Sequence, residues 1–522
     1  MNNQPTTAWQ AYEAGKDYKR RIGLYETVRR NERFYRGDQW YDSQSDLPRP
    51  VFNLIRRITD YLVCSVVPGD LSIHYTDDKL PFHTDPALRE RVMTGLSILD
   101  RNAAYRWKRD ELQSLSHKAL LNAAISGDGV FYCWWDDTRC DGQLYHGDVR
   151  TELIGNANLF VADVNSTDLQ SQEYVILSGR ATVESLRREA IENGVDPRLV
   201  STIVGDGNLE PRADDRSATE LQGAEKTTYL LRFFRENGEV IFEKSTKYCP
   251  IKRIRTGLRY YPVAYFNWNA TKGSFHGSAP VSDMIANQKY VNTAYAMAMK
   301  HMYDTAFSKV IYDKSRIPEW SNEVGEAIGA LGGGSVNDAV SVLGVGKLQE
   351  GYLDLIGNVI ENTKNMMGAT EAALGDAAAN NTSAILVLQQ ASALALRQVG
   401  TAFCRCIGEL ATVWADMLCT YCPVDRMLSA LDGDGVTALT PDYRLLKNEL
   451  LRASAEVAQV NGYTPAATVT LLDKLLNGGH ITAVQYVSLL PEGTVVNRDA
   501  LLKAVSDTNP QEPDRKEHRK NE

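Results

Sequence analysis

The sequence lacks any apolar run long enough to cross a membrane. A spanning helix needs about 18 or more consecutive apolar residues, and one of the longest runs here covers only residues 384–388. The first five residues are polar and lack the charged-then-apolar order of a secretory signal. We therefore expect no membrane contact and a protein made and used in a cytoplasm-like compartment.

An excess of positive charge is also missing. The 522 residues include 57 Lys and Arg against 66 Asp and Glu, which gives a net charge of −9. Tight binding of nucleic acid requires clustered Lys and Arg. The composition therefore argues against a protein that grips nucleic acid, although it is compatible with a surface past which DNA slides. The length allows two to four packed regions.

The short motifs of the common enzyme classes are absent. No G-x₄-G-K-[ST] phosphate loop, H-E-x₂-H pair or G-x-S-x-G nucleophile elbow is present. Residues 432–435 begin like a calcium loop, but Val436 occupies the fifth position and the glycine at the sixth position is missing. The eight histidines form no recognisable pair. We therefore expect neither catalysis nor a cofactor.

Cysteine is scarce, with eight residues in the chain. Two close pairs, Cys404 with Cys406 and Cys419 with Cys422, suggest a zinc site. Both pairs fall in a long helical pattern, where residues two apart point away from each other. Buried free thiols are the alternative, and we favour it.

The N-terminal third is expected to be mostly helical. Residues 8–36 predict one amphipathic, locally basic helix, whose polar face is either solvated or in contact with DNA. An aromatic turn at 34–40 (FYRGDQW) precedes a helix that opens near Asn53. A strand is expected at 71–75, followed by helices at 86–101 and 104–126.

From Gly127 the pattern changes to short apolar runs between turn residues. This predicts an antiparallel β region that extends to about Trp268, interrupted by a helix near 182–193. Residues 205–224 are polar and predict an exposed loop.

The centre of the chain, from Gly277 to Cys422, predicts two helices that flank a compact insert. Ser278 as cap and Pro280 in the first turn indicate a first helix to about residue 307. The insert contains Pro318 and three consecutive glycines, and a second helix is expected at about 353–374.

A loop of small residues and a very long helix complete this centre. The loop spans 375–383, and Ser383 is expected to cap a helix of about 58 Å that Pro423 ends. Its apolar stripe is Leu396, Val399, Phe403, Ile407, Leu410, Trp414 and Met417. Beyond a linker we expect helices at about 441–460, 464–477, 481–489 and 497–506, and a disordered tail from Pro510.

The order of these stretches resembles the portal proteins (head-to-tail connectors) of tailed double-stranded-DNA bacteriophages, over about residues 10–508. The resemblance depends on three stretches. They are 34–40 with Asn53; 156–163 (NANLFVAD) with 174–176 (YVI); and 265–268 (YFNW), Gly277, Ser278, Gln288, Asn292, the insert and 381–385 (NTSAI).

The resemblance implies an α+β, mainly helical, ring-forming subunit with a long helix. In family terms the wing covers 1–276, the stem helices 277–307 and 353–374, and the clip 308–352. The tunnel loop is 375–383, the long wing helix 384–422, the helical crown 423–508 and the tail 509–522. The resemblance further implies a dodecameric ring at one capsid vertex of the virion, assembled in the host cytoplasm. Its implied partners are the terminase large subunit, a head–tail adaptor, the major capsid or scaffolding protein, and double-stranded DNA.

Two candidate functional regions follow from the resemblance. In the clip, Pro318 and Trp320 are expected to dock partners, although Trp320 packed inside the insert is an equal alternative. The tunnel loop is expected to line the channel, and a simple surface turn is the alternative. Its residues are Gly375, Asp376, Ala377, Ala378, Ala379, Asn380, Asn381, Thr382 and Ser383.

Two other functions remain open on the sequence. One is a nucleic-acid-processing enzyme with an unrecognised active site, and the other is a helical scaffold without a channel. The missing phosphate loop favours the portal over the enzyme.

Overall fold

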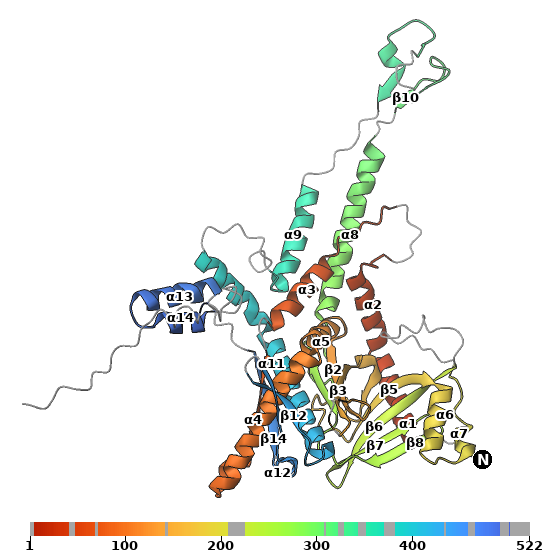
Figure 1. Cartoon of the computed structure of the whole chain (residues 1–522). Helices are drawn as coiled ribbons and strands as arrows, with labels where there is room; N and C mark the ends of the chain where they lie inside the picture. Colours follow the sequence, from red (N-terminus) through yellow and green to blue (C-terminus); the bar gives the residue numbers. More distant parts are fainter. Residues whose placement is uncertain are drawn as a thin grey trace, which may run out of the picture. The chain divides into compact units, whose positions relative to one another are not determined.

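The computed structural model describes an α+β chain with more helix than strand (Figure 1). It divides into two compact units, residues 1–67 with 72–456, and residues 68–71 with 457–522. The described residues are 5–40, 47–67, 71–140, 143, 145–206, 225–306, 310–321, 328–342, 351–369, 382–432, 435–457, 465–490 and 501. The expected loop at 205–224 lies almost entirely outside them.

Three helices open the first unit: α1 (Thr7–Arg21), α2 (Leu24–Arg36) and α3 (Leu54–Val66). The single helix expected over 8–36 is wrong, because Gly23 adopts a left-handed φ of 67° that a continuous helix cannot contain. Asn53 caps α3 as expected, since its side chain accepts a hydrogen bond from the Arg56 amide.

Two longer helices, α4 (Pro86–Arg109) and α5 (Leu112–Ser126), follow β1 (Leu71–Asp77) and the short helix η1 (Leu80–Phe82). The break between α4 and α5 falls at Asp110 and Glu111 rather than at 102–103. Glu111 has a positive φ of 49°. This left-handed backbone conformation interrupts the helix, although neither residue at the break is a glycine or proline.

The expected antiparallel β region is confirmed and forms two sheets. The first has the order β3-β2-β9, from β2 (Asp128–Asp136), β3 (Asp148–Leu153) and β9 (Val263–Asn267). The second has five antiparallel strands. They are β4 (Leu159–Val161) after η2 (Asn156–Asn158), β5 (Tyr174–Thr182), β6 (Lys226–Glu236), β7 (Glu239–Ser245) and β8 (Pro250–Arg255). Helix α6 (Val183–Glu192), expected near 182–193, packs with α7 (Pro197–Val200) against Cys249 and Ile251.

Helix α11 (Thr382–Tyr421) is 40 residues long, about 60 Å at the α-helical rise. All seven residues of the expected apolar stripe, from Leu396 to Met417, are buried. The stripe packs on the three-stranded sheet, where Phe403 meets Phe266 edge to face at 5.3 Å. Trp414 Nε1 donates to Thr151 Oγ1 at 3.0 Å. The long helix therefore forms part of the core of the first unit.

The prediction that 423–508 is helical is wrong for the first part of that region, which contains strands. Strands β12 (Leu428–Asp432) and β13 (Gly435–Leu439) pair where a linker was expected. After α12 (Tyr443–Asn448), β14 (Leu451–Val457) replaces the end of the helix expected at 441–460 and pairs with β1.

The second unit contains helices α13 (Pro465–Asn477) and α14 (Ala483–Leu489), as expected at 464–477 and 481–489. Tyr486 OH donates to Asp473 Oδ1 at 2.6 Å and joins them. Thr482 and Gln485 form a capping box at the start of α14. The helix expected at 497–506 lies mostly, and the tail wholly, outside the described residues.

Candidate channel and docking site

Helices α8 (Pro280–Thr305) and α9 (Gly351–Met366) lie side by side and antiparallel (Figure 1). Asn287 Nδ2 donates to Thr363 Oγ1 at 2.9 Å, and Tyr352 OH donates to the Ala294 carbonyl at 3.3 Å. The C-terminus of α8 and the N-terminus of α9 are therefore at the same end of the pair. The insert follows α8 at that end, and the chain towards the tunnel loop leaves α9 at the other.

The start of α8 differs from the expectation in one detail. Pro280 occupies the first turn as expected, but the cap residue is Ala279 and no side chain caps the helix. Ser278 instead uses its amide, which donates to the Asn269 carbonyl at 2.9 Å. The helix is therefore oriented by the backbone bonds of the preceding loop rather than by a serine cap.

A buried polar network fixes the N-terminal half of α8. Gln288 Oε1 accepts from the Leu54 amide at 2.9 Å, and Gln288 Nε2 donates to Asn292 Oδ1 at 2.9 Å. Asn292 Nδ2 donates to Gln39 Oε1 at 2.7 Å, and Gln39 Nε2 donates to Asn53 Oδ1 at 3.1 Å. The network thus joins the aromatic turn at 34–40, Asn53 and α8. The first two lie far from α8 in the sequence, and all three belong to the stretches that resemble portal proteins.

A second buried network has Asp128 at its centre. Asp128 Oδ1 accepts from Tyr265 OH at 2.8 Å, Asn267 Nδ2 at 3.0 Å and the Gly277 amide at 2.8 Å. Asp128 Oδ2 accepts from Asn156 Nδ2 at 2.9 Å and pairs with His276 Nδ1 at 2.7 Å. Burial would raise the pKa of Asp128, but His276 and these donors lower it overall.

The Asp128 network is a structural centre, because its members are buried. An aspartate–histidine pair is also found in catalytic sites, yet here the carboxylate is fully occupied by donors. Gly127 is required beside it, since it has a φ of 96° and a Cβ atom would lie 2.4 Å from the Gly277 carbonyl oxygen. The sequence stretches that carry the resemblance include Asn156, Tyr265, Asn267 and Gly277 but not Asp128, which begins an apolar strand and has no motif of its own.

A third cluster holds the end of α4 against β3. Asp148 pairs with Arg106, and its Oδ2 lies 2.7 Å from Arg109 Nη2. Burial acts to raise the pKa of Asp148, but the two guanidinium groups outweigh it and lower that pKa to about 2. This carboxylate is therefore ionised throughout the neutral range.

The insert contains a small antiparallel pair, β10 (Val310–Tyr312) with β11 (Val340–Val342), and the short helix η4 (Val336–Asp338). Trp320 is half-buried and stacks on Tyr312 at 5.3 Å, whereas Pro318 is exposed. Apolar side chains on the surface of the insert include Ile311, Leu331 and Val336. The insert therefore presents apolar groups beside an aromatic stack.

Several large apolar side chains on α8 and α9 are exposed in the single chain. Tyr303 is 82% and Met366 76% exposed, and Leu355 is 48% exposed. Met297, Met302 and Leu353 are also exposed. Exposed apolar side chains along a helix pair are candidates for an interaction surface in a soluble protein.

The structure describes only the last two residues of the expected tunnel loop. Residues Gly375–Asn381 lie outside the described part, while Thr382 and Ser383 already belong to the backbone of α11. Helix α11 thus begins two residues before the expected boundary at 384. Helix α9 ends at Met366, and a turn follows to Ala369, earlier than the expected end at 374.

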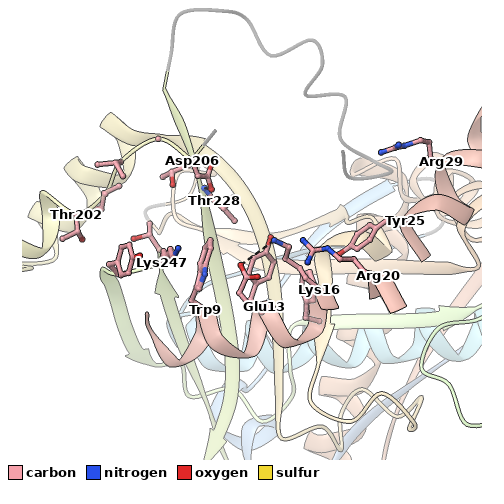
Figure 2. A pocket seen from close by; sticks show the side chains of 18 of the residues that line it. Trp9, Glu13, Lys16, Arg20, Tyr25, Arg29, Thr202, Asp206, Thr228 and Lys247 are labelled. Carbon is pink, nitrogen blue, oxygen red and sulfur yellow. Dashed lines mark hydrogen bonds and ion pairs between the residues drawn. The ribbon is translucent and has the colours of Figure 1, made fainter. Parts of the chain in front are cut away.

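The basic N-terminal helices line a cavity of about 500 Å³ (Figure 2). Its walls carry basic and acidic groups together; they include Lys16, Arg20, Arg29, Lys247, Glu13, Glu26 and Asp206. Lys16 Nζ lies 3.6 Å from Glu13 Oε1. Another basic residue, Lys19, is buried and donates to the carbonyls of Asn156 and Ala157. Mixed charge and structural use of lysine favour a solvated face over DNA contact.

Cys404, Cys406 and Cys419 lie on α11, and Cys422 directly follows it; Cys406, Cys419 and Cys422 are buried. Burial raises the pKa of Cys419 to about 12 and that of Cys422 to about 11. In the part of the chain that the structure describes, no helix has the length and apolar character needed to span a membrane.

Comparisons with known proteins bear on the middle of the chain. Residues 204–458 match the model of the phage P22-like portal protein family. No curated protein matches the chain significantly. Among solved structures, a chain described as "Neck of empty GTA particle computed with C6 symmetry" matches at 10% identity and a TM-score of 0.36. That match covers 84% of this chain and 88% of the other, and a likeness this weak carries no conclusion about this chain.

The matched segment contains α8, the insert, α9 and α11, which are the elements on which the resemblance in the sequence was strongest. It ends within the residues that follow β14. The resemblance to the portal proteins of tailed phages is therefore confirmed over residues 204–458.

Proposed function

We propose that this chain is a portal protein, one subunit of a ring-shaped channel at a capsid vertex through which DNA is packaged and ejected. The family match over residues 204–458 is the observation that carries the proposal. In this assignment residues 1–276 are the wing, α8 and α9 belong to the stem (277–307 and 353–374), and 308–352 form the clip. Residues 375–383 are the tunnel loop, α11 is the long wing helix (384–422), and 423–508 form the crown, which contains α12, α13 and α14.

Ring assembly is supported by the exposed apolar side chains of α8 and α9. A single copy leaves Leu355, Met366 and Tyr303 in water, and covering them against another copy would release that surface from water at about 25 cal/mol per Å². A closed ring uses the same two patches on each copy, so no copy is left with an open face. By the resemblance the ring has twelve subunits and belongs to the virion after assembly in the host cytoplasm.

The antiparallel stem pair separates two functions. The insert at one end is the proposed docking surface for the terminase large subunit and later for the head–tail adaptor, with Trp320 and Pro318 as candidate contacts. The loop at 375–383 is the proposed lining of the narrowest part of the channel. The wing is the proposed contact with the major capsid or scaffolding protein.

The proposed ring conducts DNA without gripping it. Each copy contributes a net charge of −9, so twelve copies sum to 12 × −9, or −108, and phosphate is repelled. We further propose that the chain is not an enzyme and uses no cofactor. Nucleotide hydrolysis is then left to the terminase.

Electron microscopy of the purified chain tests this function. We expect rings with a central hole, and we expect Leu355→Glu to abolish them, because a carboxylate would be buried against the neighbouring copy at a cost of several kcal/mol. Glu361→Gln is the matched control, since Glu361 is an exposed polar residue on the same helix. It should leave the rings intact.

Two results would contradict the portal. A wild-type chain that stays monomeric at all concentrations, alone and in proheads, would favour a helical scaffold without a channel. Nuclease or ATPase activity that copurifies with the chain and is lost on a single substitution in it would favour a nucleic-acid-processing enzyme.

A further inference from the structure

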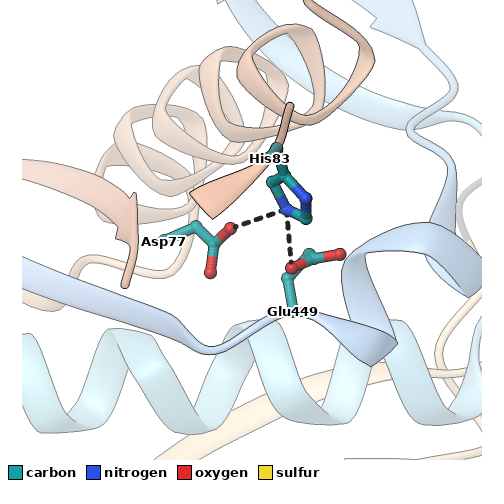
Figure 3. A group of neighbouring side chains, drawn as sticks. All are labelled: Asp77, His83 and Glu449. Atoms are coloured by element: carbon teal, nitrogen blue, oxygen red, sulfur yellow. Dashed lines mark hydrogen bonds and ion pairs between the residues drawn. The ribbon is translucent and has the colours of Figure 1, made fainter. Parts of the chain in front are cut away.

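Three potential metal ligands from two distant parts of the sequence meet beside β1 (Figure 3). Asp77 is the last residue of β1, His83 directly follows η1, and Glu449 directly follows α12. His83 Nε2 lies 3.1 Å from Glu449 Oε2 and 3.7 Å from Asp77 Oδ2. Ligands at zinc distances of about 2.0–2.1 Å stand roughly 3.4 Å apart in a tetrahedron. The two separations bracket that value.

The protein groups around Asp77 satisfy only one of its two carboxylate oxygens. Its side chain is fully buried, with a relative exposure of 0%. Oδ1 accepts hydrogen bonds from the amides of Lys79 and Leu450, both at 3.0 Å. Oδ2, which faces His83, has no hydrogen-bond partner. A buried carboxylate oxygen without a donor costs about 1–3 kcal/mol or more, so a ligand on Oδ2 would remove a real penalty.

The charges of Asp77 and Glu449 also favour the binding of a cation. Two neighbouring basic side chains are used by backbone carbonyls: Lys79 donates to that of Asn448, and Arg259 to that of Glu449 at 2.7 Å. Among the described residues, His83 is the one basic side chain that pairs with Asp77 or Glu449. Two buried carboxylates thus share a single imidazole, and a divalent ion between them would compensate their negative charge.

We propose that Asp77, His83 and Glu449 bind one divalent transition-metal ion. An imidazole nitrogen with two carboxylate oxygens suits Zn²⁺ and its neighbours in the first transition row, whereas Mg²⁺ and Ca²⁺ prefer oxygen alone. His83 keeps 16% of its side chain exposed, so the group is not sealed from solvent. The ion would clamp the end of β1 to the segment between α12 and β14.

Calorimetric titration of the untagged, chelator-treated full chain with Zn²⁺ tests the site. We expect one equivalent to bind to the wild type, and binding at this site to weaken by about 100-fold or more in His83→Gln and in Asp77→Asn. Mg²⁺ should not compete. The control is His74→Ala, because His74 lies on β1 and faces one carboxylate, Asp100, at 3.5 Å, with no second one among the residues that the structure describes. This variant should bind as the wild type does.

A spectrum of the wild-type chain loaded with Co²⁺ identifies the ligands without any variant. Visible d–d bands without a thiolate-to-cobalt band in the near ultraviolet would support the nitrogen–oxygen site, even if His83→Gln fails to fold. A thiolate band at one equivalent would place the ion on cysteine and overturn the proposal. No Zn²⁺ uptake by the wild type, or equal affinity in folded His83→Gln, would overturn it too. The site and its test are independent of whether the chain forms rings.

Discussion

The Asp128 network and the α8–α9 pair use their side chains in opposite ways. Around Asp128, five donors converge on one carboxylate inside the chain. Along α8 and α9, apolar side chains such as Tyr303 and Met366 remain in water. The first region is complete within a single copy, whereas in the proposed ring the second is completed by another copy. Substitutions in the first should therefore change folding, and substitutions in the second should change assembly or docking.

The largest effect is expected from Asp128→Ala. It removes the acceptor of five buried donors, and each unsatisfied buried group costs about 1–3 kcal/mol, so we expect a loss of at least about 4 kcal/mol in the free energy of unfolding. Thermal denaturation of the soluble chain measures it. Asp137→Ala is the control, because Asp137 is exposed just beyond the same strand. A melting temperature within 1–2 °C of the wild type would show that the network stabilises little.

A smaller and pH-dependent effect is expected at Asp148. Its folded pKa of about 2 lies below the ordinary 3.8, so its contribution is present at neutral pH and is lost as the pH falls from about 4 towards 2. Asp148→Asn should cost about 2 kcal/mol at pH 7. Urea denaturation at pH 7 and at pH 3.5 measures the difference from the wild type. That difference should narrow at the lower pH, and a constant gap would assign the loss to packing instead.

Trp320→Ala tests whether the insert docks partners, as proposed. Loss of the stack on Tyr312 should cost the chain only about 1 kcal/mol, and rings should still assemble. Binding of the terminase or of the adaptor should weaken about 30-fold, the size of an interface hot spot. Tyr312→Ala is the matched control, because it removes the same stack and keeps the tryptophan. Unchanged binding of both partners to Trp320→Ala rings would place Trp320 in the packing of the insert.

The smallest effect on folding is expected in the tunnel loop. Bulky residues at Ala377–Ala379 should change the stability of the chain by no more than about 0.5 kcal/mol, since loop side chains contribute little to a core. Proheads built with these rings should nevertheless protect little DNA from nuclease. A bulky residue at exposed Asn193 serves as control. Normal packaging with the bulky loop would show that it lies away from the channel.

The sequence predicts best where one period governs a long segment. All seven stripe positions of α11 are buried, because a long helix against a sheet repeats one packing relation many times. It predicts poorly where a single residue or a distant partner decides. Gly23 divides the first helix through its backbone angle alone. Residues 451–457 contain good helix formers but form β14, because β1 offers a strand partner nearly 400 residues earlier.

The candidate sites show the same limit. The sequence order located α8, the insert and α9, yet it gave no indication of Asp128, whose partners lie between residues 156 and 277. A network of single polar residues, each from a different element, has no spacing to detect. The exposure of Leu353 was also unpredictable, since a helical stripe looks alike whether its own chain or another copy covers it.

Because β1 pairs with β14, β1 cannot complete its sheet until β14 has been synthesised. Ser72 bonds to Glu456, and the Asp78 amide to the Leu450 carbonyl. A ribosome that adds roughly 5–20 residues per second needs about 20–80 seconds to make the chain between the two strands. During that time the backbone N–H and C=O groups of β1 lack their strand partner, and an unpaired strand edge can pair with other chains. Completion of the first unit thus depends on residues 451–457, so a chain truncated before β14 would leave that edge open.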